Sequence, residues 1–379
     1  MDFTITAEQQ ELLDLVQEIV TKEIAPRALE MDKDGVVPDE LWKILKQTGL
    51  TSLGVPKEYG GIGLDAMTLA LIFEKIAQGC AGIATACAAN MLAMLPVAFG
   101  GTPEQMQAFC DVILGGGMAA FALTEPNAGS DASAIATRAE KTEDGYILNG
   151  TKHFITNGPI ADVAVVFANA NPARGVRGLT AFIVPTDADG FSVGKVEDKM
   201  GIRASATSEL VLTDCFVPES ARLGREGSGF KWAMRTLDAS RPFVGAISVG
   251  IAEAALQAAG KYAHTRVQFG NKLIALQMVQ QMLADMAMAT EASRLLVWKA
   301  AASQMEGARN AGVMASMAKC FASDTAMKVS TDAVQIMGGA GYSKEAPLEK
   351  YMRDAKVMQI FEGSNQVQRG IIAGGLKFS

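Results

Sequence analysis

One carboxylate near the end of the chain has the surroundings expected of a general base. Glu362 follows Phe361 and comes directly before Gly363, Ser364 and Asn365. A carboxylate between an aromatic ring and a flexible backbone is poorly solvated, and poor solvation raises the pKa of a carboxyl group toward neutrality. Such a group can remove a proton from carbon near pH 7. The alternative is a glutamate at a helix end, capped by the glycine.

The composition leaves few other groups for this chemistry. The chain has 379 residues and a net charge of −7, which argues against a nucleic-acid partner because such partners need a basic face. It holds only two histidines, His153 and His264, so a histidine-rich metal site is excluded and we expect no metal. The acid–base work then falls to a carboxylate.

The sequence predicts a cytoplasmic protein without membrane insertion. Five cysteines are scattered without a C-x-x-C pair, as in a reduced compartment. Residues 1–4 carry neither a basic nor an apolar segment of the kind found in signal peptides. The most apolar run, residues 84–99, is interrupted by Asn90 and Pro96 and is predicted to be too short to span a bilayer.

The first third of the chain has the pattern of helices. Residues 6–9 have the sequence Thr-Ala-Glu-Gln, a capping box that predicts a helix start. Apolar residues then recur at helical spacing. Further helices are expected to begin at Pro38 and to cover about residues 66–78 and 82–98. Residues 61–63, Gly-Ile-Gly, are predicted to be a loop; no strand precedes them, so a Rossmann cofactor fold is not supported.

Short strands replace the helical pattern near residue 119. Residues 146–156 have strand composition, and Asn149-Gly150 within them predicts a hairpin turn. Further strands are expected at residues 163–168, 179–184, 191–196 and 209–216. Helical periodicity returns at residue 230, with long segments at 276–304 and 311–337. The chain is therefore predicted to be mainly α with a central β-domain: a helical domain at 1–118, a β-domain at 119–228 and a helical bundle at 229–379.

Four segments, in order along the chain, carry the functional signal. They are FALTEPNAGSD at residues 121–131, GTKHFITNG at 150–158, RVQFG at 266–270, and a run from DAVQIMGG at 332–339 through RDAK at 353–356 to EGS at 362–364. With these segments the chain resembles the acyl-CoA dehydrogenase family over nearly its whole length. The resemblance implies the α–β–α architecture of that family, with a β-barrel-like middle domain and a C-terminal four-helix bundle.

The resemblance implies an FAD site between the β-domain and the bundle. Thr124 would bond the pyrimidine edge of the flavin and Thr156 would reach the region of N5; the alternative is two ordinary strand threonines. Phe154 stands where many relatives have a tryptophan beside the flavin. The pocket is also expected to include Phe121, Leu123, Gly129 and Ser130, with Ser364 and Gln366 facing the cofactor side.

The resemblance also implies that the rest of the FAD site comes from a neighbouring subunit of a homo-oligomer, which is expected to be a homotetramer. An arginine suits the pyrophosphate charge, and glycine allows close backbone approach. For an isolated segment of this kind, the alternative is a surface arginine. The residues that would hold the pyrophosphate and adenine side are Arg266, Gln268, Phe269, Gln335 and Gly339.

The substrate side centres on Glu362, which matches the base of the family. Gly363 would let the backbone approach an acyl-CoA or enoyl-CoA. Arg241 matches an arginine near the active site, the alternative being a structural ion pair, and Pro242 after it suggests a helix start or turn. Further contacts with the acyl-CoA are expected from Ser130, Asp238, Arg309 and Phe361, while Arg369 fits either a CoA contact or a solvated helix.

The function implied by the resemblance is FAD-dependent α,β-dehydrogenation of a short- or medium-chain acyl-CoA in fatty acid metabolism. Electrons would pass to an electron-transferring flavoprotein. With phenylalanine at position 154, the chain resembles the butyryl-CoA dehydrogenases of anaerobes, several of which run as enoyl-CoA reductases. The alternative is therefore an acrylyl- or aryl-acrylyl-type enoyl-CoA reductase that catalyses the reverse reaction. Phe361, which replaces a common tyrosine, makes the pocket drier. A non-catalytic scaffold, or a flavin oxidase or monooxygenase on the same fold, are further alternatives.

Overall fold

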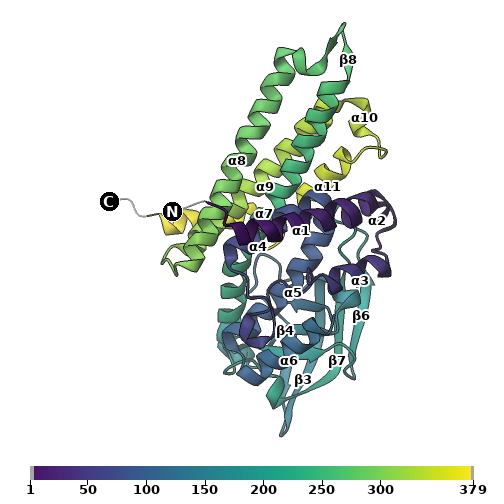
Figure 1. Cartoon of the computed structure of the whole chain (residues 1–379). Helices are drawn as coiled ribbons and strands as arrows, with labels where there is room; N and C mark the ends of the chain where they lie inside the picture. Colours follow the sequence, from purple (N-terminus) through teal and green to yellow (C-terminus); the bar gives the residue numbers. More distant parts are fainter. Residues whose placement is uncertain (1–3, 377–379) are drawn as a thin grey trace.

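Helices from both ends of the chain pack together, and the sheet lies at the lower end of the molecule in Figure 1. The computed structural model describes residues 4–376. Residues 1–3, on which the expectation of no signal peptide partly depends, lie outside the described residues, as do residues 377–379. The predicted α–β–α architecture is confirmed. The boundaries expected near residues 118 and 228 fall in the connections between a helix and a strand.

Six α-helices lie in the described part of the N-terminal domain. The predicted capping box is present, because the Thr6 hydroxyl accepts from the Gln9 N–H and the Gln9 side chain accepts from the Thr6 N–H. A π-helical turn, Val20–Ile24, continues the first helix. The helices are α1 (Ala7–Ile19), α2 (Ala28–Asp34), α3 (Asp39–Gln47), α4 (Ala66–Gly79), α5 (Ala81–Gly100) and α6 (Pro103–Leu114).

Seven strands form one sheet in the order β1-β4-β2-β3-β7-β6, with β5 paired to β4. β1 runs parallel to β4, and β3 runs antiparallel to β7 over most of its length. The two short strands β1 and β2 were not predicted from the sequence. The strands are β1 (Ala119–Ala122), β2 (Arg138–Lys141), β3 (Gly145–Thr156), β4 (Val163–Asn169), β5 (Leu179–Pro185), β6 (Phe191–Val196) and β7 (Thr207–Pro218).

The predicted hairpin at Asn149-Gly150 is wrong, because β3 continues through both residues. The pairing with β7 shifts between Leu148 and Gly150, which marks a β-bulge. Gly150 has φ +154°, and a Cβ there would come within 2.5 Å of the Thr137 hydroxyl. A glycine of this kind serves a bulge as readily as a hairpin turn. The chain instead turns before β3, where the Thr142 N–H donates to the Gly145 carbonyl.

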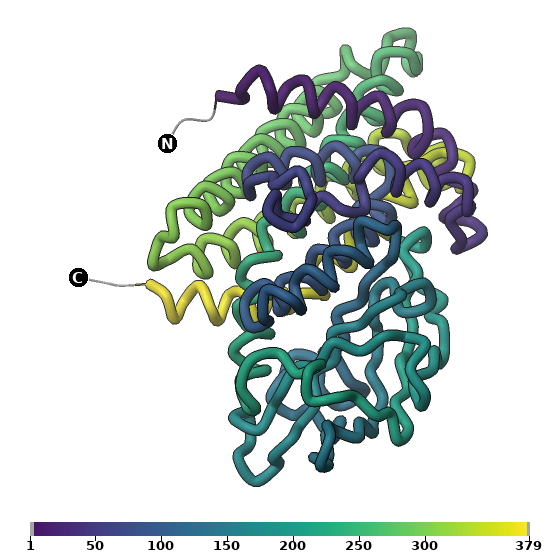
Figure 2. Tube along the Cα trace, turned by 60° about the horizontal axis from the view of Figure 1, so that its bottom comes forward, coloured from purple at the N-terminus to yellow at the C-terminus, as the bar shows by residue number. Residues whose placement is uncertain are grey.

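The C-terminal domain is a bundle of long helices. α7, α8 and α9 pack against one another, α11 packs on α7 and α9, and α12 packs on α9. α4 of the first domain packs on α7 and α8, so the two helical domains share one body, as Figure 2 shows from another side. The elements are α7 (Gly229–Thr265), β8 (Val267–Gln268), β9 (Asn271–Lys272), α8 (Gln277–Met305), α9 (Ala311–Met337), α10 (Gly339–Tyr342), α11 (Leu348–Met358) and α12 (Asn365–Gly375).

The expectation that Pro242 starts a helix or turn is wrong, because it lies inside α7. Proline has no N–H, so the carbonyl four residues earlier, that of Asp238, loses its helical partner. The Gln304 amide of α8 donates to this carbonyl at 2.9 Å and to the carbonyl of Ala239 at 3.2 Å. A neighbouring helix thus replaces the hydrogen bond that the proline removes.

The sheet is buried on both faces at β4. Val163, Val165 and Phe167 join the large core that continues into the helical domains, and the alternate residues Ala164 and Val166 join a smaller core on the other face. This follows from the two-residue period of a strand. The β-domain is therefore attached to the helices through a continuous apolar core.

Within residues 4–376, two helices are long and apolar enough to cross a membrane by length and composition, α5 and α7. The prediction that the run at residues 84–99 is too short is thus wrong about length, because α5 extends to 20 residues and accommodates Pro96. Both helices are mostly covered by protein: 72% of the apolar window of α5 and 67% of that of α7 are buried. They are core helices of this fold.

A buried ion pair holds the segment after β1 to the sheet. The Lys152 ammonium of β3, which is fully buried, lies 2.7 Å from the Glu125 carboxylate and 3.2 Å from the Leu123 carbonyl. Burial opposes the charge of Glu125, but Lys152 together with donors from Thr137 and Ala136 outweighs it and lowers the pKa of Glu125. Burial lowers the pKa of Lys152 to about 8.

Lys152→Met should destabilise the fold by about 3–5 kcal/mol, because it leaves the Glu125 carboxylate buried without a cation. The matched control is Lys22→Met, at an exposed helix pair with Glu18, which should leave stability unchanged. Urea unfolding midpoints of the two variants measure the difference. Equal midpoints would contradict a structural contribution from the buried pair.

Candidate active site

A cavity of about 430 Å³ lies between the β-domain and the helical domains. Its walls come from α5, β1 and the loop after it, the end of β3, α7, the connection between α11 and α12, and α12 itself. Eleven of the residues expected at the site line it together: Phe121, Leu123, Thr124, Gly129, Ser130, Phe154, Thr156, Arg241, Phe361, Glu362 and Gly363.

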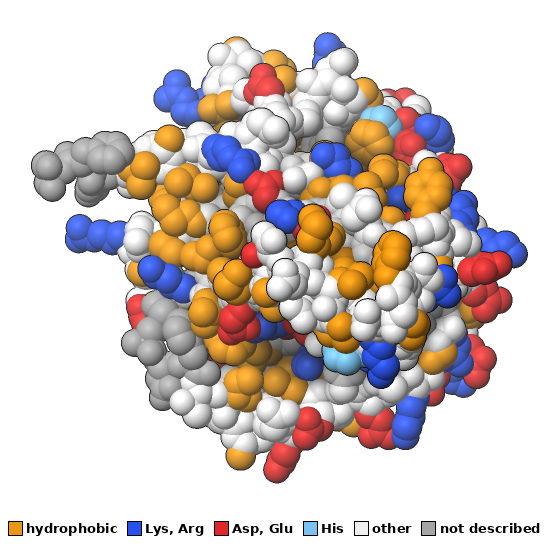
Figure 3. Space-filling model, turned by 90° about the horizontal axis from the view of Figure 1, so that it is seen from above, with side chains coloured by type: hydrophobic (Ala, Val, Ile, Leu, Met, Phe, Trp, Pro, Cys, Tyr) orange, Lys and Arg blue, Asp and Glu red, His pale blue; other side chains and the backbone are white. Residues whose placement is uncertain are grey.

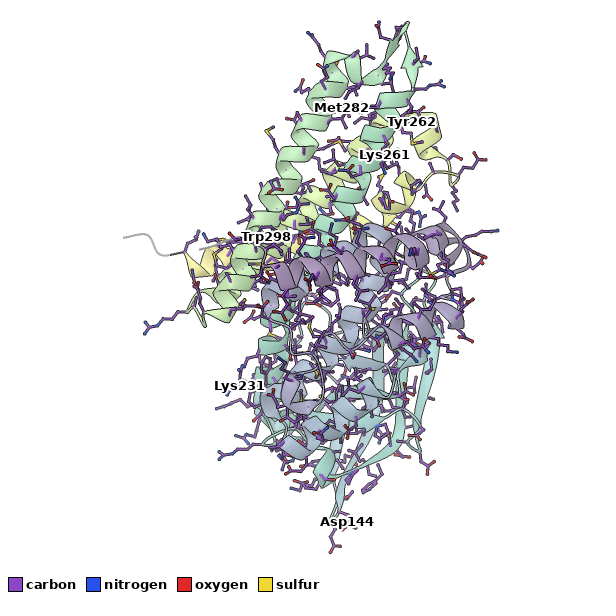
Figure 4. All side chains as sticks on the ribbon, viewed as in Figure 1. Asp144, Lys231, Lys261, Tyr262, Met282 and Trp298 are labelled. Carbon is purple, nitrogen blue, oxygen red and sulfur yellow. The ribbon has the colours of Figure 1, made fainter. Side chains whose placement is uncertain are left out.

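Five expected residues lie far from this cavity, at the tip of the bundle. Figure 4 marks both ends of α7, with Lys231 beside the β-domain and Tyr262 near the tip. From Arg241 to the end of α7 at Thr265 the axis rises about 36 Å at 1.5 Å per residue. One chain therefore does not bring these residues to the cavity: Arg266, Gln268, Phe269, Gln335 and Gly339.

Four other expected residues lie outside the cavity lining. Arg309 is exposed in the connection between α8 and α9, and Gln366 is exposed on α12. The Ser364 hydroxyl caps α12 by accepting from the Val367 N–H. Asp238 is half-exposed and forms an ion pair with Arg241. Cofactor or substrate contacts by these four residues stay predictions.

Glu362 occupies a strained turn between α11 and α12. Its φ is +53°, a left-handed conformation that is rare for residues other than glycine and often found at functional sites. Its carboxylate accepts a hydrogen bond from the Ser240 hydroxyl of α7. Burial raises the pKa of Glu362; the Ser240 hydrogen bond and the charges of Arg241 and Lys319 oppose this effect without cancelling it.

Gly363 continues the left-handed turn with φ +92°. A Cβ at this position would come within 2.3 Å of the Gln368 amide nitrogen, so any other residue would displace the Gln368 side chain as well as strain the backbone. The backbone N–H of Glu362, directly before it, donates to no described residue. The turn thus presents a free N–H donor beside a carboxylate of raised pKa.

Arg241 was expected either beside the active site or in a structural ion pair, and the structure shows both. Its side chain is buried at 5% exposure and forms an ion pair with Asp238, as the structural alternative requires. Its Nε also lies 3.5 Å from the Glu362 carbonyl, and its side chain lines the cavity. The same guanidinium is therefore part of an ion pair and part of the site.

The sheet side of the cavity offers hydroxyl groups without protein partners. The side chains of Thr124 and Thr156 line the cavity, and neither hydroxyl hydrogen-bonds to another described residue. Phe154, 58% exposed and at φ +56°, stacks on His153 with ring centroids 4.0 Å apart. A Cβ on Gly129 would meet nothing within 4 Å. A flat aromatic ligand with polar edges fits these surroundings.

The sequence analysis did not identify three side chains that lie around Glu362: Ser240, Lys319 and Gln368. Ser240 directly precedes Arg241, and Gln368 lies in the same segment as Glu362, so local sequence offered a signal for each. For Lys319 the only signal is that it is the single charged residue among residues 311–323, which are otherwise apolar or small. Among the described residues, no group of three or more His, Cys, Asp or Glu is placed to hold a metal ion.

Three domain models of one family match the chain in order. The acyl-CoA dehydrogenase N-terminal domain matches residues 6–116, the middle domain residues 120–215 and the C-terminal domain residues 227–377. The matches cover most of the chain and include every residue that lines the cavity.

Curated relatives align over nearly the whole chain. The chain is 45% identical to a cyclohex-1-ene-1-carbonyl-CoA dehydrogenase of Geobacter metallireducens over 99% of both chains. It is 46% identical to a short-chain-specific acyl-CoA dehydrogenase of Megasphaera elsdenii, over 99% of this chain and 100% of the relative. It is 42% identical to an acryloyl-CoA reductase (NADH) of Anaerotignum propionicum, over 98% and 95%.

Solved structures share the complete fold. A chain in a structure described as the electron-transferring flavoprotein of Acidaminococcus fermentans is 46% identical, covers 100% of both chains and has a TM-score of 0.97. Butyryl-CoA dehydrogenase from Megasphaera elsdenii is 46% identical over 99% of both chains, with a TM-score of 0.95. An FAD complex of PigA is 31% identical over 99% and 98%, with a TM-score of 0.93.

Glu362→Gln should make the folded protein more stable than wild type at alkaline pH. The pKa of Glu362 is raised in the folded state, so its contribution to stability is complete at acid pH and is lost as pH rises through the raised value. Glutamine stays neutral throughout. The gain in unfolding temperature should therefore be small near pH 5 and larger at pH 8.

The control is Glu18→Gln, at an exposed carboxyl whose pKa is lowered by Lys22, which should give no gain at pH 8. Thermal unfolding at several pH values measures both variants. A Glu362→Gln protein that is less stable than wild type at pH 8 would rule out a net cost of the buried charge.

Proposed function

The chain belongs to the acyl-CoA dehydrogenase family, an FAD-dependent family of oxidoreductases, and on that premise we propose that it interconverts a short-chain acyl-CoA and its trans-2-enoyl-CoA. The observation that carries this proposal is the Glu362 carboxylate, of raised pKa, facing two threonine hydroxyls without protein partners across one cavity. Short-chain specificity is supported by the Megasphaera elsdenii relative, described as short-chain specific.

Glu362 is the proposed base for the α-proton of the thioester. A carboxyl group with a raised pKa is a stronger base than an ordinary carboxylate once it has ionised, and the Ser240 hydroxyl holds it in place. As the proton leaves, negative charge develops on the thioester oxygen and needs a donor. The free N–H of Glu362 can supply one.

FAD, when bound, supplies the acceptor for the β-hydrogen as hydride. The residues that fit it are those of the sheet side of the cavity. Thr124 and Thr156 have free hydroxyls for the polar edges of the flavin, Phe154 offers an exposed ring, and Gly129 leaves open space. The buried Lys152 ammonium donates to the Leu123 carbonyl and so holds the sheet side of the cavity in place.

The remaining FAD contacts are proposed to come from a second copy of the chain. Phe269 is 90% exposed and left-handed at a hairpin tip, a costly arrangement for an apolar side chain that is so little covered by its own chain. Figure 3 shows apolar side chains gathered on the face seen from this end. The exposed apolar residues of the tip are Val267, Phe269, Met278 and Tyr342.

An electron-transferring flavoprotein is the proposed electron partner. Support comes from the chain that shares the complete fold at 46% identity in a structure described as that of such a flavoprotein. The alternative direction, reduction of an enoyl-CoA, is favoured by the likeness to an acryloyl-CoA reductase. An inactive scaffold is disfavoured because Glu362, Thr124 and Thr156 are present and meet in one cavity.

Glu362→Gln should slow the reaction by orders of magnitude while leaving binding intact. Butyryl-CoA should reduce the flavin of the wild type under anaerobic conditions, and octanoyl-CoA should do so more slowly. In the variant, stopped-flow absorbance should show the rate lowered by about 10²–10⁴, with FAD content and acyl-CoA affinity within a few-fold of wild type.

If butyryl-CoA reduced the flavin of that variant at a near-normal rate, Glu362 would be excluded as the base. A colourless protein that cannot be reconstituted with FAD would favour the scaffold.

The wild type tests substrate and direction. Faster flavin reduction by octanoyl-CoA than by butyryl-CoA would contradict short-chain specificity. Reoxidation of the reduced flavin by acryloyl-CoA, faster than reduction by any acyl-CoA, would favour the reverse direction. Rapid reoxidation by air would instead indicate an oxidase or monooxygenase.

Arg266→Ala should weaken FAD binding although Arg266 lies far from the cavity of its own chain, because the proposed contact comes from a neighbour. The control is Arg235→Ala, another exposed arginine of the same domain that is not among the expected site residues. FAD affinity by fluorescence quenching and assembly state by sedimentation measure the effect. A monomer that binds FAD normally would contradict the shared site.

A further inference from the structure

A fully buried lysine lies behind the turn that carries the proposed base. Lys319 of α9 has no exposed surface, and its ammonium donates to the Gly363 carbonyl at 2.8 Å and to the Asn365 side-chain oxygen at 3.0 Å. Its own helix surrounds it with small apolar residues, among them Ala315 and Ala322. A buried ammonium is retained only where its partners compensate the lost hydration, so the two acceptors explain its presence.

A second buried side chain donates to the same turn from the other side. The Gln368 amide nitrogen of α12 lies 3.1 Å from the carbonyl of Glu362 and 3.1 Å from that of Gly363. The Gln368 side-chain oxygen is buried and has no partner among the described residues. An amide that leaves its oxygen unpaired is unfavourable for packing alone. The two bonds to the turn therefore account for glutamine at this position.

Both donors act on peptides that are held in a strained conformation. Glu362 and Gly363 have φ +53° and +92°, and their carbonyl groups point toward Lys319 and Gln368. With the carbonyls held this way, the Glu362 carboxylate reaches Ser240 and its N–H stays free. Without the donors, the strained peptides are free to rotate and to move both groups.

We propose that Lys319 and Gln368 are positioning residues, which clamp the carbonyls of Glu362 and Gly363 so that the carboxylate of Glu362 faces the reacting carbon and its N–H faces the thioester oxygen. This inference rests on the proposed role of Glu362 as the base. Neither side chain lines the cavity, so both act through the turn.

The two members of the clamp differ in charge, which separates their effects. Glu362 faces Arg241, itself paired with Asp238, on α7 and Lys319 on α9. Further along α9 and α12, Asp324 and Arg369 pair at 2.6 Å. The cation of Lys319 lowers the pKa of Glu362 against the raising effect of burial, whereas Gln368 is neutral. Loss of Lys319 should therefore raise the apparent pKa of the base, and loss of Gln368 should not.

Lys319→Met and Gln368→Met test the clamp in the FAD-loaded protein, with Lys328→Met as the matched control. Lys328 is an exposed lysine of the same helix, paired with Asp332. Both clamp variants should slow flavin reduction by butyryl-CoA by about 10–100-fold while acyl-CoA affinity changes only a few-fold, because small displacements of reacting groups have effects of this size. The control should match wild type.

The pH profile and hydrogen exchange distinguish positioning from general destabilisation. The acid limb of the reduction rate should move to higher pH in Lys319→Met and stay in place in Gln368→Met. Amide exchange in residues 360–366 should be faster in both clamp variants than in Lys328→Met, without substrate present. If Lys319→Met does not fold, Gln368→Met decides the question, since it leaves no donor or cation unpaired.

Reduction rates within twofold of wild type and unchanged exchange in Gln368→Met would overturn the proposal. Failure of the proposed function has a different signature. A Glu362→Gln protein that still reduces its flavin normally would remove the base, yet faster exchange in the clamp variants would still show that Lys319 and Gln368 hold the turn.

Discussion

The left-handed turn at Glu362 and Gly363 is the constraint on which the site depends. A short connection between α11 and α12 must place a carboxylate in a poorly hydrated cavity and keep its N–H unpaired, and two consecutive positive φ angles achieve this. Such a conformation persists only where its surroundings determine it. Ser240 from α7, Lys319 from α9 and Gln368 from α12 all contact the turn, so three helices of the bundle converge on it.

The architecture holds two chemically different walls of the cavity opposite each other. The bundle supplies the charged and strained wall, and the sheet supplies the wall with free hydroxyls. A continuous apolar core joins β4 to the helices, and the buried pair of Lys152 with Glu125 fixes the segment that carries Thr124. Rigidity on both sides suits chemistry in which a proton and a hydride leave neighbouring carbons.

α7 connects these requirements along one helix. Ser240 and Arg241 on it contact Glu362, and Pro242 next to them breaks the helical hydrogen bonding at the same turn. Gln304 repairs the break from α8. The same helix then runs on to Arg266 at the exposed tip, where the proposed contacts with a second copy lie. One end of α7 thus carries residues beside Glu362, and its other end carries the residues that are proposed to complete the FAD site of a second chain.

Local sequence was sufficient for most of the elements, though not for the short strands β1 and β2, and for the residues of the family motifs. Helical periodicity, the capping box at Thr6 and the segments around Thr124, Thr156 and Glu362 act over a few residues, and the structure brings most of the expected residues into one cavity. Local signals failed where one residue type serves two conformations. Gly150 suits a bulge as well as a hairpin, and Pro242 is tolerated inside a helix because a distant side chain replaces the lost bond. Only the tertiary structure could decide that Lys319, 43 positions from Glu362 along the chain but in contact with its turn, belongs to the site, because the energy of a buried ammonium depends on acceptors that folding alone brings within reach.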